Sequence, residues 1–242
     1  MRKSWLPVGL LWLAYTVLLI ALTKYVNVLP AQWAEEAHVV DEAFLLLMYL
    51  GSPVMALVLA VMTWGMFAWR SDGADRDDGP NQHNSRVLVT TWLVITSALA
   101  IGVLINPGFV GLAEIRGEPS SDYVIEMEAA QFFWQVTYPN GATAVDELVV
   151  PAEKRVRYDV SSIDVLHSFW IPAFRVKIDA VPGVPTQVYT TATDEGTMED
   201  DVNLRIQCAE LCGAGHASMS LPVRVVSDAE FIEYFESLGG SE

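Results

Sequence analysis

Basic residues are scarce in this chain of 242 residues, which has 14 Lys and Arg against 30 Asp and Glu and a formal net charge of −16. From Ala113 onward, 22 acidic and eight basic residues leave a net charge of −14. This balance excludes nucleic acid as a partner, because phosphate backbones are bound through Lys and Arg. It is compatible with steering of a cationic protein partner, and equally with the general surface of a protein from a salty environment.

Cysteine is scarcer still, since the chain has only Cys208 and Cys212. Their four-residue spacing permits one disulfide, which is common outside the cytoplasm. No Cys-x-x-Cys-His sequence follows, and this excludes a fused c-type haem. The chain also lacks internal repeats.

Apolar residues are abundant, at 52% of the chain with a mean hydropathy of +0.31, and the excess lies in the first 112 residues. Three runs, at about 6–28, 43–69 and 87–106, are each long enough to cross a hydrocarbon core of about 30 Å as a helix. Arg2 and Lys3 before the first run are typical of a signal peptide. However, the run is longer than the usual apolar core of about 7–15 residues and no Ala-x-Ala site follows promptly, so we expect a retained helix.

The basic residues predict the orientation of these three helices. With three crossings, the N-terminus and the loop between the second and third runs fall on one side, which the positive-inside rule makes the cytoplasm. The loop 30–41, which has no Lys or Arg, and everything after Pro107 then lie outside. The basic residues concerned are Arg2, Lys3, Arg70, Arg76 and Arg86.

After residues 113–122, which look like a linker, the pattern changes to short β-prone runs separated by turn signals. About 120 residues of this kind, from 123 to 242, fit an all-β Greek-key sandwich. The tail Asp228–Leu238 has apolar residues at helical spacing and predicts a C-terminal helix with Asp228 as N-cap. The strands expected are Tyr123–Tyr138, Glu147–Val150, Arg155–Val160, Val184–Thr193, Val202–Cys208 and Pro222–Val226.

One short run concentrates metal-binding side chains: Cys208-Ala-Glu-Leu-Cys212-Gly-Ala-Gly-His216-Ala-Ser-Met219. A further imidazole, His167, lies upstream. Two thiolates, two imidazoles and a thioether suit copper, and they can hold two ions if the sulfurs bridge and each metal gains one imidazole. A mononuclear blue-copper site needs only one Cys. Zinc would accept the Cys2His2 set but leaves Met219 unexplained.

The run resembles the binuclear copper (CuA) motif C-x-E-x-C-x-x-x-H-x-x-M of subunit II of the haem–copper respiratory oxidases. The segment from Asp164 to Gly183 resembles the other copper segment of that family, and the resemblance extends from about Asp41 to Ser227. It implies a cupredoxin-like barrel, with two membrane helices matched by the second and third runs and an extra first helix. The ligands that the resemblance implies are bridging Cys208 and Cys212, one imidazole each from His167 and His216, weakly bound Met219, and the backbone carbonyl of Glu210.

The same resemblance implies further features of the complex. The Glu210 carboxylate would face a magnesium or manganese ion shared with a haem-containing catalytic subunit I, and further membrane subunits are expected. The segment Gln131-Phe-Phe-Trp134 resembles the aromatic segment Q-W-x-W, whose first Trp accepts electrons in many cytochrome c oxidases. That position is Phe132 here, Trp134 matches the second Trp, and these two residues are the candidates for the point where electrons enter. Cytochrome c is therefore less secure as the donor, and another small redox protein such as a blue-copper protein becomes credible.

A second departure concerns proton uptake. His83 and Trp92 match a family pattern in which proton-pumping members carry a Glu three residues before the Trp. This chain has Val89 there. Because carboxylates in membranes are costly and usually functional, the proton path lies elsewhere or the enzyme differs.

The sequence therefore predicts the electron-accepting subunit of a terminal cytochrome c oxidase in the cell membrane of a prokaryote. Its copper domain would lie on the periplasmic or extracellular face and its N-terminus in the cytoplasm. Electrons would pass from a small redox protein through copper to haem, where oxygen is reduced to water, and this chain alone would not turn over. The alternatives are the CuA subunit of a nitric oxide reductase and a copper-binding or copper-delivery module.

Overall fold

The computed structural model describes residues 5–26, 28–68, 85–116 and 120–239, and the chain forms two compact units. Unit 1 comprises Met1–Val28 and Glu42–Leu112, whereas unit 2 comprises Leu29–Asp41 and Ala113–Glu242. Unit 2 is therefore assembled from two stretches of chain that unit 1 interrupts. Several residues of the sequence argument lie outside the described residues, namely Arg2, Lys3, Arg70, Arg76 and His83.

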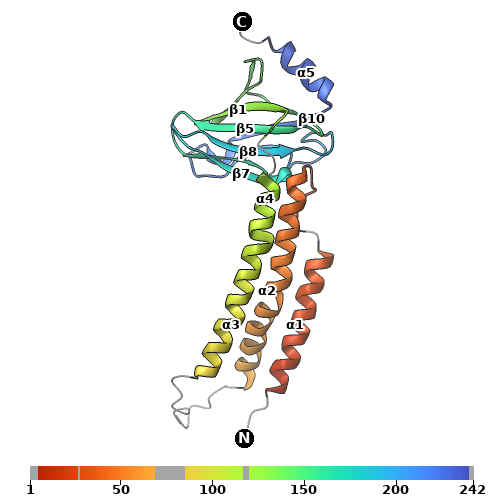
Figure 1. Ribbon diagram of the computed structural model, residues 1–242, viewed down its shortest axis with the longest axis vertical. Coiled ribbons are helices and arrows are strands. Elements are labelled where there is room, and N and C mark those ends of the chain that lie inside the picture. The colour runs from red at the N-terminus through yellow and green to blue at the C-terminus, as the bar shows by residue number, and fades with distance from the viewer. Residues whose placement is uncertain (1–4, 27, 69–84, 117–119, 240–242) are drawn as a thin grey trace. The chain divides into compact units, whose positions relative to one another are not determined.

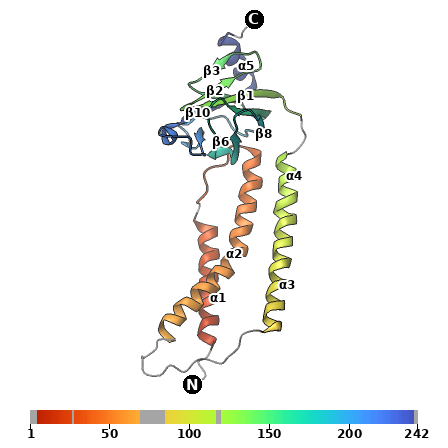
Figure 2. The ribbon, with the colours of Figure 1, turned by 90° about the vertical axis from the view of Figure 1, so that its left-hand side faces the viewer.

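Three helices are long and apolar enough to cross a membrane: Leu6–Tyr25 (α1), Glu35–Ala68 (α2) and the stretch Arg86–Arg116 (Figures 1 and 2). α2 begins at Glu35 and not at residue 43 as expected, so the loop before it is shorter than residues 30–41. Acidic side chains in the first turn explain this difference, because they favour the positive end of the helix dipole. Glu35 and Glu36 occupy that turn.

The third stretch differs from the expected helix 87–106. The α-helix Arg86–Val103 (α3) is followed by Leu104–Phe109 (η1) and by a further α-helix, Val110–Arg116 (α4). The expected end at Asn106 is a kink, since Asn106 has φ −136° and ψ 117°. Pro107 restricts the preceding residue to extended backbone, and its missing N–H interrupts the helical hydrogen bonds. Helical structure thus continues to Arg116, inside the expected linker 113–122.

The first helix packs against the second within unit 1. The Trp12 indole donates a hydrogen bond to the carbonyl of Pro53 at 2.8 Å, and the hydroxyls of Tyr15 and Thr63 lie 3.2 Å apart. Polar contacts of this kind join helices in lipid, where no general hydrophobic force drives helices together.

The outer domain in unit 2 is a sandwich of two five-stranded sheets (Figures 1 and 2). One sheet has the order β3-β2-β1-β5-β8 and the other β4-β10-β9-β6-β7. Alternating burial along β5 shows which face of its sheet packs into the core. The strands are β1 Tyr123–Ala130, β2 Phe133–Thr137, β3 Thr143–Ala144, β4 Leu148–Pro151, β5 Arg155–Ser162, β6 His167–Ile171, β7 Val176–Ala180, β8 Thr186–Thr191, β9 Arg205–Cys208 and β10 Ser220–Val226.

These elements confirm the expected fold class of membrane helices followed by an all-β cupredoxin-like domain. The single strand expected at Tyr123–Tyr138 is wrong, because it folds back on itself as the antiparallel pair β1 and β2. Strands β6 and β7 were not among those expected. The C-terminal helix is Asp228–Ser237 (α5), and its N-cap is Ser227 instead of Asp228: the Ser227 hydroxyl accepts a hydrogen bond from the Glu230 amide.

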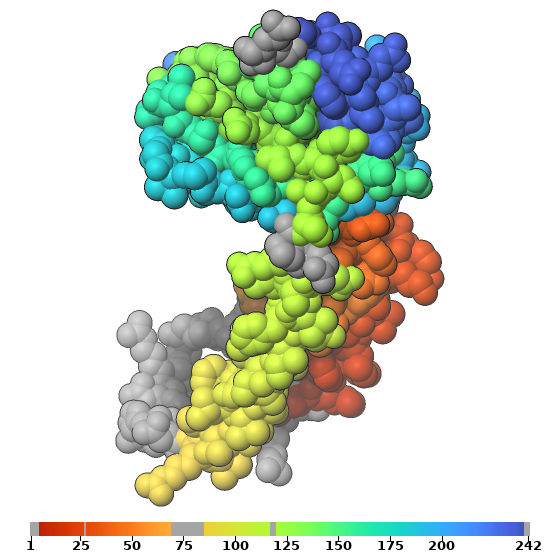
Figure 3. All heavy atoms as spheres, turned by 45° about the horizontal axis from the view of Figure 1, so that its top comes forward, coloured from red at the N-terminus to blue at the C-terminus, as the bar shows by residue number. Residues whose placement is uncertain are grey.

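Helix α5 covers part of the sandwich (dark blue in Figure 3). Phe231 and Phe235 are its buried side chains, and both lie against the ring of Tyr138. The oxygen of the Tyr138 hydroxyl accepts a hydrogen bond from the Val149 amide at 2.9 Å. The helix therefore closes one end of the core.

The segment Leu29–Asp41 belongs to the outer domain through buried polar contacts. The Arg175 guanidinium donates to both carboxylate oxygens of Asp41, with Nε–Oδ1 2.8 Å and Nη2–Oδ2 2.9 Å. Arg175 has a left-handed backbone with φ +59°, which costs a non-glycine residue about 1–2 kcal/mol. The Trp33 indole N–H donates a hydrogen bond to the Asp201 carboxylate at 3.0 Å. The Trp33 ring also packs on Gly196, because a Cβ on Gly196 would lie 2.5 Å from the ring.

Candidate metal centre

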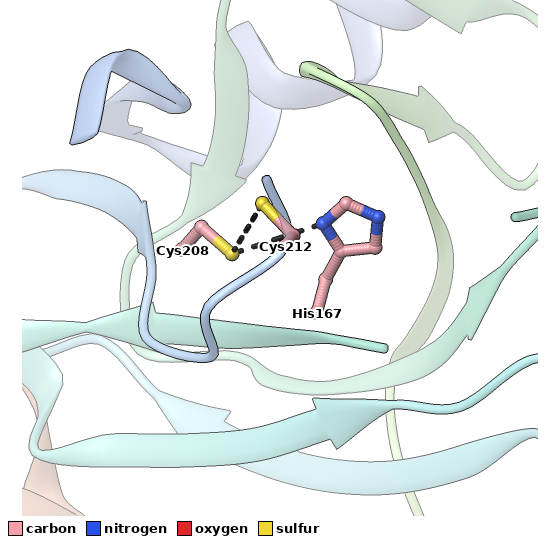
Figure 4. Close-up of side chains that lie close together, drawn as sticks. All are labelled: His167, Cys208 and Cys212. Carbon is pink, nitrogen blue, oxygen red and sulfur yellow. Dashed lines mark hydrogen bonds between the residues drawn. The ribbon is translucent and has the colours of Figure 1, made fainter. Parts of the chain in front are cut away.

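The strands bring the predicted ligands together at one end of the sandwich. His167 is the first residue of β6 and Cys208 the last of β9, and these strands pair with Phe169 opposite Cys208. The chain then forms the loop after β9, which carries Cys212, and the single turn His216–Ser218 (η3) before Met219. The side chains of His167, Cys208, Cys212 and Met219 are buried. Figure 4 shows Cys208 facing both Cys212 and the ring of His167.

The donor atoms lie close together. Cys208 Sγ is 3.8 Å from Cys212 Sγ and 3.8 Å from His167 Nδ1. Cys212 Sγ is 3.7 Å from His216 Nδ1 and 3.8 Å from Met219 Sδ. The carbonyl oxygen of Glu210 is 3.2 Å from Cys208 Sγ. All six residues of the predicted ligand set thus meet around the two sulfurs.

A carboxylate orients the first imidazole. Asp164 Oδ1 lies 2.9 Å from His167 Nε2, which leaves Nδ1 directed to Cys208. Burial disfavours the charged form of Asp164, but hydrogen bonds from His167 and from the amides of Gln131 and Val165 outweigh it and lower its pKa to about 2. A carboxylate behind a histidine fixes its tautomer and orientation, as it does in metal sites.

A second loop supports the cysteine loop. The Gln131 amide side chain donates to the carbonyl of Cys212 at 2.5 Å, and the Gln131 backbone N–H donates to Asp164. The Phe132 ring lies against the glycines of the cysteine loop, because a Cβ on Gly215 would be 2.4 Å from the ring and one on Gly213 3.2 Å. The loop thus has glycine where an aromatic ring approaches its backbone.

The spacing of the donor atoms fits metal binding. Ligands that share one ion at bond lengths of about 2.0–2.3 Å in a tetrahedral arrangement lie roughly 3.3–3.8 Å apart. The observed Sγ–Nδ1 and Sγ–Sγ distances fall at the upper end of this range. The two sulfurs are much too far apart for a disulfide bond of about 2.05 Å, and both cysteines are free. Burial, then the neighbouring Cys208, raise the pKa of the Cys212 thiol to about 11, so metal binding would release protons.

The donor atoms of the cluster are not all equally close to one another. The ligand atoms of His167, Cys208 and Cys212 all lie within 4.8 Å of one another, and this group does not include His216. A single tetrahedral zinc would require all four donor atoms within about 3.8 Å of each other. The soft thiolate and thioether donors suit copper. The residues present therefore fit a copper site.

The two aromatic residues predicted for electron acceptance lie in different environments. Phe132 is exposed, whereas Trp134 is buried in the core, with its ring centroid 6.3 Å from that of His167 and 6.0 Å from that of Phe169. Trp134 therefore forms no part of the surface around Phe132. Phe132 lies in the turn before β2, whereas Trp134 is a buried residue of β2 that follows the exposed Phe133.

Sequence reasoning missed the residues that support the ligands: Asp164, Gln131 and Gly215. Asp164 stands three residues before His167, and this spacing is the signal that could have found it. Gln131 and Gly215 gave no local signal, because their partners lie in another loop. Glu210 is exposed, and its carboxylate stays a predicted ligand for magnesium or manganese.

Comparisons with known proteins agree with this geometry. Residues 140–226 match the family described as cytochrome c oxidase subunit II, periplasmic domain. The chain is 30% identical over 208 residues to haem–copper oxidase subunit 2 of Aeropyrum pernix, covering 80% of this chain and 87% of that protein. This chain belongs to the subunit II family of the haem–copper oxidases. It is also 27% identical to cytochrome c oxidase subunit 2 of Thermostichus vulcanus, over 85% of this chain and 76% of that protein.

Among solved structures, the periplasmic domain of subunit II of cytochrome oxidase from Bradyrhizobium japonicum is similar, with 34% identity and a TM-score of 0.44. The match covers 50% of this chain and 95% of that structure. Subunit II family membership confirms a membrane protein that is part of an oxidoreductase complex, with a domain of the periplasmic type and a His–Cys–Cys cluster suited to copper.

Proposed function

We propose that this chain is the electron-accepting subunit of a prokaryotic terminal oxidase and holds a binuclear copper centre. Cys208 and Cys212 bridge the two ions, His167 and His216 bind one ion each, and Met219 and the Glu210 carbonyl are weak additional ligands. The observation that carries this proposal is the set of five contacts of 3.2–3.8 Å that joins these six residues around the two sulfurs.

When bound, copper would supply one-electron redox chemistry, because the ion cycles between its +1 and +2 states, and two neighbouring ions would share the added charge. The chain supplies a rigid and dry setting for it. His167 and Cys208 stand on paired strands, and the buried side chains exclude water. Ligands that are locked by packing and hydrogen bonds keep their positions when the charge changes, so little reorganisation accompanies electron transfer.

The proposal extends to the surroundings of the centre. Electrons come from cytochrome c or a blue-copper protein and pass to haem in the catalytic subunit I, which reduces oxygen to water. The Glu210 carboxylate binds magnesium or manganese at the boundary with subunit I. The outer domain, residues 123–242, faces the periplasm or the cell exterior, and the N-terminus is cytoplasmic. The absence of Lys and Arg between residues 29 and 41 supports this orientation.

The test is to purify the full chain in detergent, load it with copper, and measure metal content and electron paramagnetic resonance. We expect two copper ions per chain and a seven-line hyperfine pattern, because one unpaired electron is shared by two copper nuclei. A four-line pattern with one ion would assign the chain to mononuclear copper binding or copper delivery, and a lack of bound copper would refute the proposal altogether.

A further inference from the structure

The side chain of Trp134 reaches across the sandwich to one of the predicted ligands. Trp134 lies on β2 in one sheet and is 1% exposed, whereas His167 and Phe169 lie on β6 in the other sheet and are fully buried. The ring of Trp134 meets both of these rings edge-on, at interplanar angles of 65° to His167 and 78° to Phe169. The indole therefore packs on two successive inward-facing side chains of β6, and one of them belongs to the cluster.

The register of the strands explains why the indole lies at this end of the core. Trp134 stands opposite Ala129 on β1, and Ala129 stands opposite Ser162 on β5, so these three buried side chains form one row. The small side chain of Ala129 leaves room for the indole. The Ser162 hydroxyl donates a hydrogen bond to Asp164 Oδ1 at 3.3 Å, and the same oxygen bonds to Nε2 of His167. Trp134 and Asp164 thus approach one imidazole from different sides.

The bond to Asp164 leaves one freedom of the imidazole unrestrained. It fixes the tautomer of His167 and the position of Nε2. The last side-chain torsion of histidine is broad, however, so the ring can turn about its bond to Cβ. This rotation moves Nδ1 more than Nε2, because Nε2 lies nearer to the rotation axis. Nδ1 is the atom that faces Cys208 Sγ at 3.8 Å, so the ring needs a second restraint.

The indole provides this restraint. The imidazole of His167 is enclosed, and its edge-on neighbour Trp134 leaves no space into which the ring can turn. Phe169 supports the indole in turn, because it packs on Trp134 at a centroid distance of 6.0 Å and on Tyr158 at 5.3 Å. The position of Nδ1 therefore depends on Trp134 as well as on Asp164.

The indole N–H indicates that Trp134 is more than a core-filling residue. Its Nε1 is buried and has no hydrogen-bond acceptor within the described part of the chain. A buried donor without a partner costs free energy, so Phe would fill the core at a lower cost. In the described residues, the other buried side-chain atoms without a partner belong to side chains that are 21–29% exposed, namely Arg155 Nε, Arg157 Nε and Asp159 Oδ1.

We propose that Trp134 is a positioning residue of the metal centre, which holds the plane of the His167 imidazole and thereby directs Nδ1. This proposal rests on the proposed function of the cluster. It replaces the electron-entry role that the sequence predicted for Trp134, because a side chain that is 1% exposed offers no surface to a donor. The two rings of the indole span the distance between His167 and Phe169, and the single ring of Phe is too short to do so.

The experiment compares Trp134→Phe with a matched exchange, Trp170→Phe, in the full copper-loaded chain. Trp170 also lies on β6, but its ring is half-buried and packs on the exposed Lys177, with Nζ 4.6 Å from the ring centroid. For Trp134→Phe we expect two copper ions, an altered hyperfine splitting in electron paramagnetic resonance, and release of copper to a chelator that is about tenfold faster. The unfolding midpoint of the metal-free chain should stay unchanged or rise. Trp170→Phe should keep the wild-type splitting and release rate.

A double variant tests whether Trp134 acts through His167. Asp164→Ala removes the other restraint on the same ring. In Trp134→Phe/Asp164→Ala, copper binding should be weakened by less than the product of the two single effects, because residues that act on one group are not independent. Competition with a copper chelator measures all three variants.

Three results would overturn the positioning role. They are wild-type splitting and release rate in Trp134→Phe, equal changes in Trp170→Phe, and a double variant whose effect equals the product of the single effects. The first would make the indole a core residue only, and the third would mean that it acts elsewhere than on His167. The proposed function fails separately, if the wild-type chain binds no copper or lacks the seven-line pattern.

Discussion

The two imidazoles of the cluster are held in different ways. His167 stands on strand β6, is fully buried, and has Nε2 bonded to Asp164. His216 opens the single turn η3 and is half-buried, and within the described part of the chain no hydrogen bond to its Nε2 occurs. The cluster thus has a sheet-held half, built on His167 and Cys208, and a loop-held half, built on Cys212 and His216.

The difference shows where the stability of each half originates. Pairing of β6 with β9 fixes the sheet-held half as a consequence of folding. The loop-held half depends on a loop that Gln131 and Phe132 support from outside. We therefore expect that the loop-held half loses its ion first when the site is perturbed, whereas the sheet-held half resists until a thiolate is removed.

The largest effect should come from the sulfurs, because in the proposed centre each of them binds both ions. Cys208→Ser and Cys212→Ser should each abolish the seven-line signal and reduce the copper content to one ion or none. Copper content and electron paramagnetic resonance of the purified chain measure this. If either variant kept two ions with shared spin, the thiolates would not bridge.

The next effect should separate the halves. Gly215→Ala places a Cβ 2.4 Å from the Phe132 ring, so the cysteine loop or the ring must move. We expect faster loss of one copper ion to a chelator, with the ion of the sheet-held half retained. Adding Phe132→Ala removes the clash and should restore retention, since residues in contact show non-additive effects. Equal loss of both ions would contradict the division into halves.

A smaller effect should follow from Asp164, which contacts the imidazole of the sheet-held half directly. Asp164→Ala should weaken copper binding about 10–100-fold, as is typical for partners of metal-bound histidines, and Asp164→Asn should recover part of it. Competition with a copper chelator measures this. The control is Asp179→Asn, an exposed carboxylate on β7. An equal effect of the control would show that only the overall charge matters.

The same carboxylate has a pH signature in the metal-free chain. Its folded pKa of about 2 lies below the unfolded value of about 3.9, so Asp164 stabilises the fold above about pH 4, and this contribution is lost as the pH falls toward 2. The difference in unfolding midpoint between wild type and Asp164→Asn should therefore shrink from pH 5 to pH 2. A constant difference would assign the effect to packing.

The smallest effect should come from Met219→Leu. The side chains are similar in volume, so the free energy of unfolding should change by less than about 1.5 kcal/mol, and both ions should stay. The reduction potential should shift, because a weak axial sulfur tunes a copper site. Voltammetry and copper content measure the two effects. Copper loss as large as in the cysteine variants would show that Met219 is a structural ligand.

The sequence predicted which residues meet in the cluster far better than it predicted the residues that support them. Cys208, Cys212, His216 and Met219 lie within twelve residues, so their chemistry is visible in a single short window. The predicted set meets in the structure because a loop of that length folds back on the end of β9. The contact of Phe132 with Gly215 had no such signal, since packing between distant loops depends on how the sheets align them.

The fold shows the same limit. The length of the apolar runs was enough to predict the three membrane helices. Their observed ends differ from the predicted ones where Glu35 favours an earlier helix start and where Pro107 interrupts the helical hydrogen bonds. A turn at Gln131 and Phe132 divides the expected strand in two. The turn was not predicted, because apolar and aromatic residues continue through it without Gly or Pro. The ion pair of Asp41 with Arg175 joins residues 134 positions apart and leaves no pattern in the sequence.

That ion pair has a consequence for how the protein is made. Asp41 and Trp33 leave the ribosome before all of α3, yet their partners Arg175 and Asp201 are synthesised more than a hundred residues later. The outer domain therefore completes its fold only after the membrane helices have been translated. A fragment that begins at Tyr123 leaves the Arg175 side chain without its carboxylate, and an expression design that fuses residues 29–41 to that fragment through a flexible linker restores the pair.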